Sequence, residues 1–143
     1  MRVSQLSVFL ENKSGRLADV TRALAEAKIN IRALSIADTI DYGLLRLIVN
    51  DPAAAKSALT AQGFTVTLTE VLAIEIPDRP GGLAGIIDIL GEAGINIEYM
   101  YAFVGTSGEN AIVIFRIEKV DEAIAILQRK GVRMLTGDEL HSL

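Results

Sequence analysis

Apolar and polar positions alternate at the start of the chain. Leucine and valine stand at positions 6, 8 and 10, and the residues between and after them are Ser7, Phe9 and Glu11. This two-residue period predicts a strand. After a turn at 12–15, apolar residues recur at positions 17, 20, 24 and 27, which is the spacing of one helical face. The chain is therefore expected to begin with a strand, a turn and a helix.

Four further elements are predicted in the first half of the chain. They are strands at 29–38 and 44–50 around a hairpin at 41–43, a helix that starts after position 51, and a last strand at 65–69. Asp51 can cap the second helix, Pro52 suits its first turn, and Gly63 can end it. The predicted order is strand, helix, strand, strand, helix, strand.

The chain contains an internal repeat with an offset of 66 residues. Residues 15–31 align with 81–97 without a gap, and nine of the seventeen pairs are identical. The identical pairs are Gly15/Gly81, Leu17/Leu83, Ala18/Ala84, Leu24/Leu90, Glu26/Glu92, Ala27/Ala93, Ile29/Ile95, Asn30/Asn96 and Ile31/Ile97. About one identity is expected by chance in a pairing of this length, so the chain is a duplication.

The second half predicts the same elements in the same order. They are strands at 72–77, 95–104, 110–117 and 132–136, a first helix with apolar residues at 83, 86, 87 and 90, and a second helix at about 120–130. The order βαββαβ is the split βαβ, or ferredoxin-like, plan. We therefore predict an α+β fold of two tandem modules with antiparallel sheets, one at 1–70 and one at 71–143.

Composition and charge narrow the classes of function. The formal net charge is -4 and no basic stripe is present, which argues against nucleic acid as a partner. There are no cysteines, and the single histidine, His141, stands near the C-terminus, where chains are usually mobile. Serine–histidine–aspartate chemistry and histidine or thiolate metal sites therefore lack material. We expect no enzyme activity, no cofactor and no metal.

No segment predicts a membrane association. The N-terminus has no long apolar core of a signal peptide, and no run of about 18 apolar residues occurs. We expect a cytoplasmic protein with no membrane partner.

The two strand-to-helix turns are the strongest candidate binding features. Free backbone N–H groups at a helix N-terminus, with the helix dipole, favour an anion such as a carboxylate. Gly15 and Gly81 would let a ligand approach the backbone closely. The alternative is that Asn12 and Asp78 cap the helices and that the glycines serve only the turns.

An asparagine between two isoleucines recurs in both halves, at Asn30 and Asn96. A side-chain amide can accept from an ammonium and donate to a carboxylate, the two roles that amino-acid recognition needs. The alternative is an asparagine that satisfies local backbone groups, and the recurrence could come from the duplication alone.

The two copies resemble ACT domains. The resemblance lies in Leu-Ser-Val-Phe-Leu-Glu-Asn-Lys-Ser-Gly-Arg-Leu before a helix and Ile-Asn-Ile, and in Ile-Pro-Asp-Arg-Pro-Gly-Gly-Leu before Ala-Gly-Ile-Asn-Ile. It covers essentially the whole chain as two modules and implies regulatory binding of amino acids at module interfaces. The ligand-binding residues that it implies are Asn12, Ser14, Gly15, Arg16, Leu17, Asn30 and Ile31, and Asp78, Pro80, Gly81, Gly82, Leu83, Asn96 and Ile97.

The first copy departs from the family pattern at two positions of its turn. It has Ser14 where the family usually has proline, and Arg16 where a small or apolar residue is common. Arg16 could clamp a ligand carboxylate or fill the pocket. In the second copy, Asp78 would attract an ammonium and repel a carboxylate. The two sites therefore need not be equivalent.

The residues and the resemblance together predict a regulatory protein that senses a small molecule, an amino acid by the resemblance, and acts on a separate enzyme or transporter. An alternative is a regulatory subunit of an amino-acid biosynthetic enzyme, because the opening segment also resembles the small subunit of acetolactate synthase. That family usually carries a different C-terminal domain after one ACT module, so the second copy counts against it. We expect a homodimer, because one duplicated chain still leaves exposed sheet edges.

Overall fold

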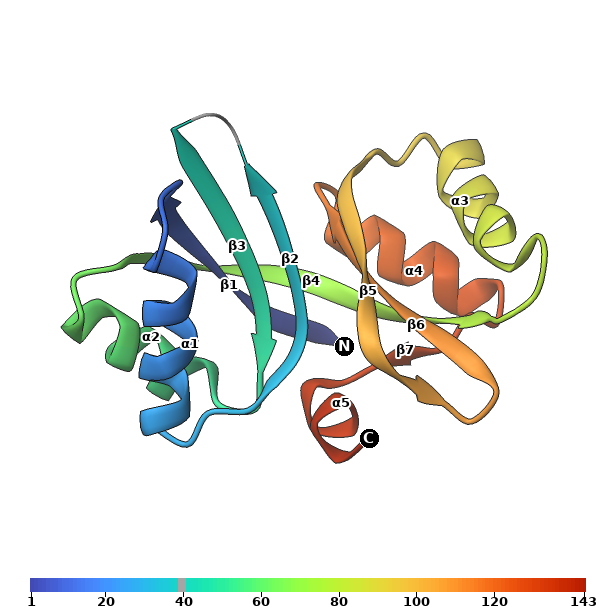
Figure 1. Ribbon diagram of the computed structural model, residues 1–143. Coiled ribbons are helices and arrows are strands. Elements are labelled where there is room, and N and C mark those ends of the chain that lie inside the picture. The colour runs from blue at the N-terminus through green and yellow to red at the C-terminus, as the bar shows by residue number, and fades with distance from the viewer. Residues whose placement is uncertain (39–40) are drawn as a thin grey trace. The chain divides into compact units, whose positions relative to one another are not determined.

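The computed structural model describes residues 1–38 and 41–143 and divides the chain into two compact units (Figure 1). The first module is Ser4–Thr69, and the second module is Glu70–Leu143 together with Met1–Val3. The division after Thr69 lies one residue before the predicted boundary. The three N-terminal residues, expected in the first module, belong to the second.

The first module has the order βαββαβ. Its elements are β1 (Arg2–Glu11), α1 (Arg16–Glu26), β2 (Ile31–Asp38), β3 (Tyr42–Val49), α2 (Pro52–Ala61) and the start of β4 (Thr65–Pro77). Strand β3 lies between β1 and β2 and is antiparallel to both, and β1 is also paired with β4. Residues 39 and 40, beside the predicted hairpin at 41–43, lie outside the described part of the chain.

The second module repeats this order with the remainder of β4 as its first strand. The elements that follow are α3 (Gly82–Glu92), β5 (Ile97–Ser107), β6 (Asn110–Ile117), α4 (Val120–Arg129), β7 (Met134–Leu135) and α5 (Gly137–Ser142). The strand order is β5-β6-β4-β7, and each of these neighbours is antiparallel. The α+β class and the antiparallel sheets are as predicted.

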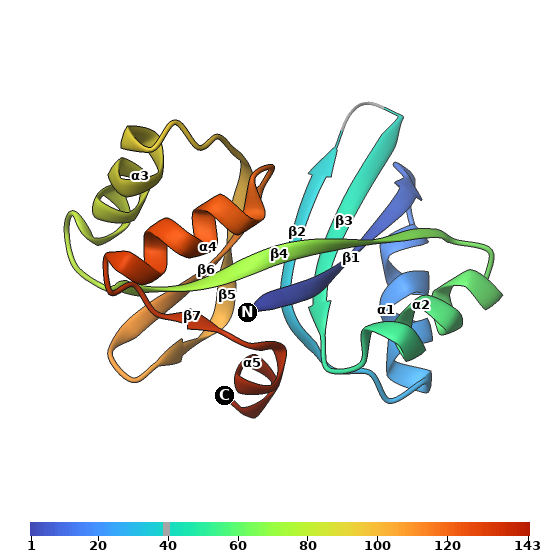
Figure 2. The same ribbon diagram turned by 180° about the vertical axis from the view of Figure 1, so that it is seen from behind.

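The strand that spans the module boundary was not predicted as one element. The strands expected at 65–69 and 72–77 are a single strand, β4, visible from end to end in Figure 2. No glycine or proline interrupts residues 65–76, and threonine, valine and isoleucine are frequent among them, so nothing breaks the extended backbone. The expected break between the strands is therefore wrong.

The C-terminal end also differs from the prediction. The strand expected at 132–136 is only Met134–Leu135, and the helix α5 follows it. The Thr136 hydroxyl accepts a hydrogen bond from the Glu139 N–H, while the Glu139 carboxylate accepts one from the Thr136 N–H. This capping box orders the segment that contains His141, which was expected to be mobile.

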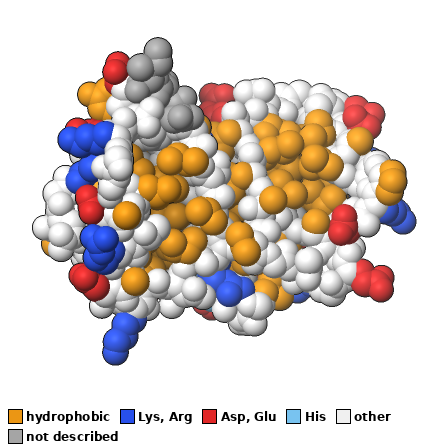
Figure 3. Space-filling view, in the orientation of Figure 1, with side chains coloured by type: hydrophobic (Ala, Val, Ile, Leu, Met, Phe, Trp, Pro, Cys, Tyr) orange, Lys and Arg blue, Asp and Glu red, His pale blue; other side chains and the backbone are white. Residues whose placement is uncertain are grey.

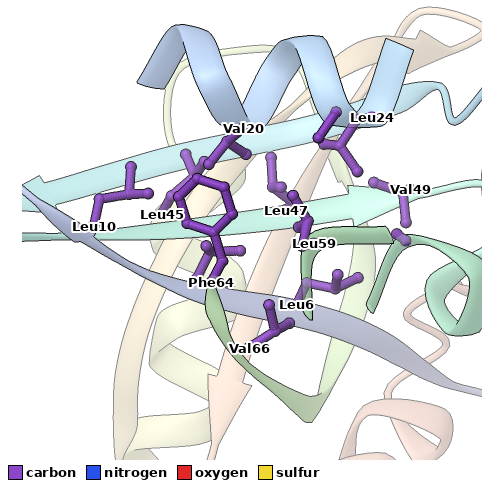
Figure 4. Close-up of a cluster of buried hydrophobic side chains, with 13 residues drawn as sticks. Leu6, Leu10, Val20, Leu24, Leu45, Leu47, Val49, Leu59, Phe64 and Val66 are labelled. Carbon is purple, nitrogen blue, oxygen red and sulfur yellow. The ribbon is translucent and has the colours of Figure 1, made fainter. Parts of the chain in front are cut away.

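Each module has its own hydrophobic core between its helices and one face of its sheet. In the first module, Val20 and Leu24 of α1 point toward Leu45 and Leu47 of β3 (Figure 4). The second core contains Leu72, Ile74 and Ile76 of β4 with Ile86 and Leu90 of α3.

The predicted inner face of α1 is only partly correct. Val20 and Leu24 are buried, and so is Ala23, but Leu17 is 44% exposed and Ala27, the residue that caps the end of the helix, is also exposed. Leu17 lies in the first turn of the helix, beside the surface depression described below.

Among the described residues, no helix is long and apolar enough to cross a membrane.

The duplication is visible in the backbone as well as in the sequence. The register of β2 shifts between Ile31 and Ala33, and that of β5 shifts between Ile97 and Tyr99. These positions differ by 66 residues, the offset of the sequence repeat. A shift in strand register therefore follows the repeated asparagine in both modules.

Candidate ligand-binding turns

The turn between β1 and α1 is held by three backbone hydrogen bonds. Lys13 donates to the carbonyl of Glu11 (2.9 Å), Arg16 to that of Lys13 (3.4 Å), and Asp19 to that of Gly15 (2.9 Å). Gly15 precedes the helix with φ 91°, in the left-handed region that glycine adopts most readily.

The turn between β4 and α3 has the same construction. Arg79 donates to the carbonyl of Pro77 (2.9 Å), Gly82 to that of Arg79 (3.0 Å), and Gly85 to that of Gly81 (3.0 Å). Gly81 has φ 85°. All three bonds match those of the first turn at the repeat offset of 66, so the duplicated sequence builds the same backbone twice.

The helices begin at these glycines and not at the preceding polar residues. Gly15 and Gly81 are the N-cap residues, and neither helix has a side-chain cap. The alternative in which Asn12 and Asp78 cap the helices is therefore wrong. Within residues 1–38 and 41–143, no acceptor satisfies the second and third amides of either helix, which belong to Leu17, Ala18, Leu83 and Ala84.

The first turn borders two adjoining surface depressions of the first module. The first depression, called the side-chain compartment here, is about 220 Å³, and its apolar walls are Leu10, Leu17, Ile36 and Gly43. The second, called the polar hollow, is about 380 Å³ and includes Asp41 and Tyr42. The two share one polar rim, which consists of Glu11, Asn12 and Lys13.

The rim carries both signs of charge. The Lys13 ammonium lies 2.9 Å from a carboxylate oxygen of Glu11. The hydrogen bond from Lys13, and then its charge, lower the pKa of the Glu11 carboxyl, so Glu11 is ionised at neutral pH. Asn12 is exposed between them, and its backbone N–H donates to the carbonyl of Asp41 (3.0 Å). A zwitterion would find an anion, a cation and free amides within this one region.

Comparison with known proteins identifies the architecture to which these matched turns belong. The family model for the ACT domain pair matches residues 1–143. The chain belongs to the ACT domain pair family. A search of the curated proteins found no match.

Solved structures agree with this assignment. A crystal structure of a protein from Bacteroides thetaiotaomicron is 43% identical, with a TM-score of 0.94, and the match covers 100% of this chain and 98% of that one. The ligand-free regulatory subunit of aspartate kinase from Thermus thermophilus is 20% identical, with a TM-score of 0.62 and coverage of 88% and 91%. At that identity the likeness shows the fold alone. The match to the Bacteroides thetaiotaomicron protein therefore includes both ACT modules of this chain and nearly the whole length of that protein.

The repeated asparagines of the ACT modules do not meet the turns of their own module. Strands β1 and β2 are both antiparallel to β3, so the start of β2 lies at the opposite end of the sheet from the turn after β1 (Figure 1). The Asn30 N–H donates to the side-chain oxygen of Asn50 (3.0 Å), and the Asn50 N–H donates to the carbonyl of Asn30 (3.2 Å). These bonds use the backbone of Asn30 and the side chain of Asn50, so both interpretations of the Asn30 side-chain amide stay predictions. A ligand contact from a facing module stays a prediction for Asn30, Ile31, Asn96 and Ile97.

Arg16 faces away from the side-chain compartment of the first ACT module. Its guanidinium carbon lies 4.6 Å from the centre of the Phe64 ring, and one of its nitrogens lies 3.3 Å from Asp19. Arg16 therefore neither fills the compartment nor lines it. Its backbone remains part of the turn, as do those of Ser14 and Gly15, which are exposed.

The second ACT module admits no side chain at the position that matches Arg16. A Cβ on Gly82 would lie 2.0 Å from the carbonyl oxygen of Pro77. Asp78, Pro80 and Gly81 are exposed, and Leu83 packs half-buried against the second core. The second turn is therefore the same motif with a tighter approach between strand and helix.

Sequence reasoning found Asn12 and Leu17 but missed the other five residues that line the compartment and its rim, which are Leu10, Glu11, Lys13, Ile36 and Gly43. Leu10, Glu11 and Ile36 were interpreted only as strand positions, Lys13 only as part of the turn, and Gly43 only as part of a hairpin. Gly43 lies opposite Leu10 in the β1–β3 register, which the sequence does not reveal. The charged neighbours Glu11 and Lys13 at positions i and i+2 across the turn were the one signal that could have indicated the rim.

Proposed function

We propose that this ACT pair is a non-catalytic regulatory protein that binds a free amino acid at its strand-to-helix turns and acts on a separate protein. Each module is inferred to be the ferredoxin-like version of the α+β fold. The observation that carries the proposal is the first turn, where the helix begins with the free amides of Leu17 and Ala18, and where Leu17 lines the same depression as Glu11 and Lys13. The amides and Lys13 suit a ligand carboxylate, while Glu11 and Asn12 suit an ammonium.

Regulation would follow from the coupling between ligand binding and the contacts of the modules. A ligand shifts an equilibrium only by its difference in affinity between two states, and the coupling acts in both directions. By the family resemblance, residues of a facing module, Asn30 or Asn96, would complete a turn site. Occupancy would then favour one arrangement of modules over another, in this chain or in the expected homodimer.

A thermal-shift screen of the whole chain against the twenty amino acids tests the proposal. A ligand that binds only the folded state raises the melting temperature. We expect one amino acid, or one chemical class, to raise it, and Asn12→Ala to reduce the shift. Asp78→Ala is the matched variant at the repeat offset, and its effect on the shift measures the contribution of the second turn. If none of the twenty raises the melting temperature, the sensor proposal fails.

The regulatory-subunit alternative differs in the identity of its partner. A subunit of a biosynthetic enzyme would co-purify with that enzyme as a stable complex, whereas a free-standing sensor would elute alone or as a homodimer. A second ACT module follows the first in this chain, whereas the small subunit of acetolactate synthase usually has a different domain after one ACT module. Light scattering at micromolar concentration should give the mass of two chains.

A further inference from the structure

The side-chain compartment of the first ACT module owes its shape to a glycine. Gly43 is buried and lies opposite Leu10 in the β1–β3 register. A Cβ on Gly43 would lie 3.6 Å from the Cδ1 of Ile36 and 3.9 Å from the Cβ of Leu10. Both of those residues are walls of the compartment. The missing side chain of Gly43 would therefore project into the compartment, and a methyl group there would meet its walls at ordinary contact distances.

The second ACT module has that methyl group. Ala111 lies opposite Ile76 in the β4–β6 register, just as Gly43 lies opposite Leu10. The wall residue differs too. Ile36 pairs with Leu45, which is two positions after Gly43. In the second module, Ala102 pairs with Val113, which is two positions after Ala111. At the matched positions the second module thus has a methyl group where the first has the hydrogen of Gly43, and the small side chain of Ala102 where the first has Ile36.

The polar rim also differs between the modules. The positions that match Glu11 and Lys13 at the repeat offset are Pro77 and Arg79. The second rim keeps the cation but has no carboxylate at the matched position, and Asp78 replaces the neutral amide of Asn12. The Glu11–Lys13 contact is therefore particular to the first module, whereas the second rim has its carboxylate one position later, at Asp78.

We propose that the amino acid binds in the first ACT module alone, that it carries a branched aliphatic side chain, and that Gly43 is the residue that admits this side chain. This inference rests on the proposed function. The walls of the compartment are aliphatic, and no charged group lines it except at the rim. Its volume of about 220 Å³ is below the roughly 300–1,000 Å³ typical of sites for larger ligands, which favours a single small amino acid.

The exposure of two walls supports a ligand in this place. Leu17 is 44% exposed and Ile36 is 53% exposed, although both border a groove whose floor is buried. Figure 3 shows apolar side chains at the surface of the protein. A branched aliphatic ligand in the compartment would cover part of Leu17 and Ile36. Removing that apolar area from water favours binding in proportion to the area covered.

Isothermal titration of the full chain with L-leucine, L-isoleucine and L-valine tests the inference, with L-lysine, L-aspartate and L-phenylalanine as competitors from other classes. The key variant is Gly43→Ala, which copies the second module. The matched control is Ala111→Gly, which makes the reverse exchange at the same register position. We expect Gly43→Ala to weaken binding of the branched amino acids at least tenfold and Ala111→Gly to leave it within twofold.

Ile36→Ala provides a second route if Gly43→Ala does not fold. Ile36 is largely exposed, so the fold should tolerate the change, and loss of this wall should weaken binding several-fold. Binding of a charged amino acid, or branched-chain binding that is lost in Ala111→Gly and unchanged in Gly43→Ala, would overturn the inference and leave the sensor proposal standing. Binding of no amino acid at all would overturn both.

Discussion

The two ACT modules have the same backbone arrangement, but different side chains stabilise it at matched positions. The helix that follows the turn ends in the same way in both, with a residue in the left-handed region at Lys28 (φ 60°) and at Gly94 (φ 72°). The next residue then donates to the same helical carbonyl, Ile29 to that of Leu24 and Ile95 to that of Leu90, each at 2.9 Å. A duplication therefore conserves hydrogen-bond geometry while the side chains that support it diverge.

The sheet face away from the helices also differs between the two modules. Phe9 of β1 and Glu75 of β4 occupy matched positions. Phe9 is 49% exposed, whereas the Glu75 side chain is only 12% exposed and accepts hydrogen bonds from Asn110 (3.3 Å) and Arg133 (3.4 Å). Arg133 also binds Glu139 of α5 (2.6 Å), so the network ties the C-terminal helix to the second sheet. The first module leaves an apolar group in solvent where the second builds a polar network.

The largest effect is expected at the matched pair Arg16/Gly82. Gly82→Ala would place a Cβ 2.0 Å from a backbone carbonyl, which cannot yield without moving the turn, and should cost about 3 kcal/mol of unfolding free energy. Arg16→Ala removes the contact with Phe64 and the partly exposed ion pair with Asp19 and should cost about 0.5–1 kcal/mol. Urea unfolding of both variants measures the difference. Equal costs would contradict the tighter second turn.

The next largest effect on the unfolding free energy is expected from the hydrogen-bond network of Glu75. Burial alone would raise the pKa of Glu75, but hydrogen bonds from Ser107 and Asn110 and the charge of Arg133 outweigh it and lower the pKa. A lowered pKa contributes stability above the ordinary value near 4.5, and that stability is lost as the pH falls through the folded-state pKa. Glu75→Gln should therefore cost about 2 kcal/mol at pH 7.

The pH dependence distinguishes the charge of Glu75 from its shape. The gap in unfolding free energy between the wild type and Glu75→Gln should narrow as the pH falls from about 4.5 through the lowered folded-state pKa of Glu75, below which both side chains are uncharged. Phe9→Gln, at the matched position, should show no such pH dependence. A gap that stays constant from pH 7 to pH 3 would mean that the network contributes through packing alone.

The second helices of the two modules allow a test of capping. Asp51 accepts a hydrogen bond from the Ala54 N–H (3.1 Å) at the start of α2, whereas Lys119 begins α4 without a side-chain cap. Asp51→Ala should cost about 1 kcal/mol, and Lys119→Asp should gain a similar or smaller amount. Thermal unfolding measures both changes. A stability loss in Lys119→Asp would show that the lysine has a role that the cap does not replace.

The smallest effect is expected at the ends of the first helices. Lys28→Gly should stabilise the chain by about 0.5–1 kcal/mol, since glycine adopts the left-handed region without the cost that a side chain brings. Gly94→Ala should destabilise it by a similar amount. The pair of variants is best compared by urea unfolding in the same buffer, and shifts of the same sign in both would refute this account of the helix ends.

Much of the fold was predictable because the signals are local. Asp51, Pro52 and Gly63 act within a few residues of themselves, and the structure confirms each as expected. The capping box of Thr136 and Glu139 was equally local and was overlooked. The continuity of β4 was not predictable from a boundary drawn by the repeat, because a duplication unit need not end where a strand ends.

The candidate site was harder to predict because its walls come from three strands and a helix. The turn residues could be found from glycine and helix signals, and the recurrence at an offset of 66 strengthened them. Gly43 and Ile36 join the site only through strand register, which sequence periodicity does not fix. The direction of the Arg16 side chain depends on Phe64, which is 48 positions later in the chain, and no local pattern indicates it.

The most direct test of the central claim is an amide NMR titration of the full chain with the amino acid found by the thermal-shift screen. The first ACT module should respond at its turn, because the free amides of Leu17 and Ala18 would receive the ligand carboxylate. We predict that the resonances of these two amides move with increasing ligand and that those of Leu83 and Ala84 move much less. Equal movement at both turns, or movement at neither, would contradict the account.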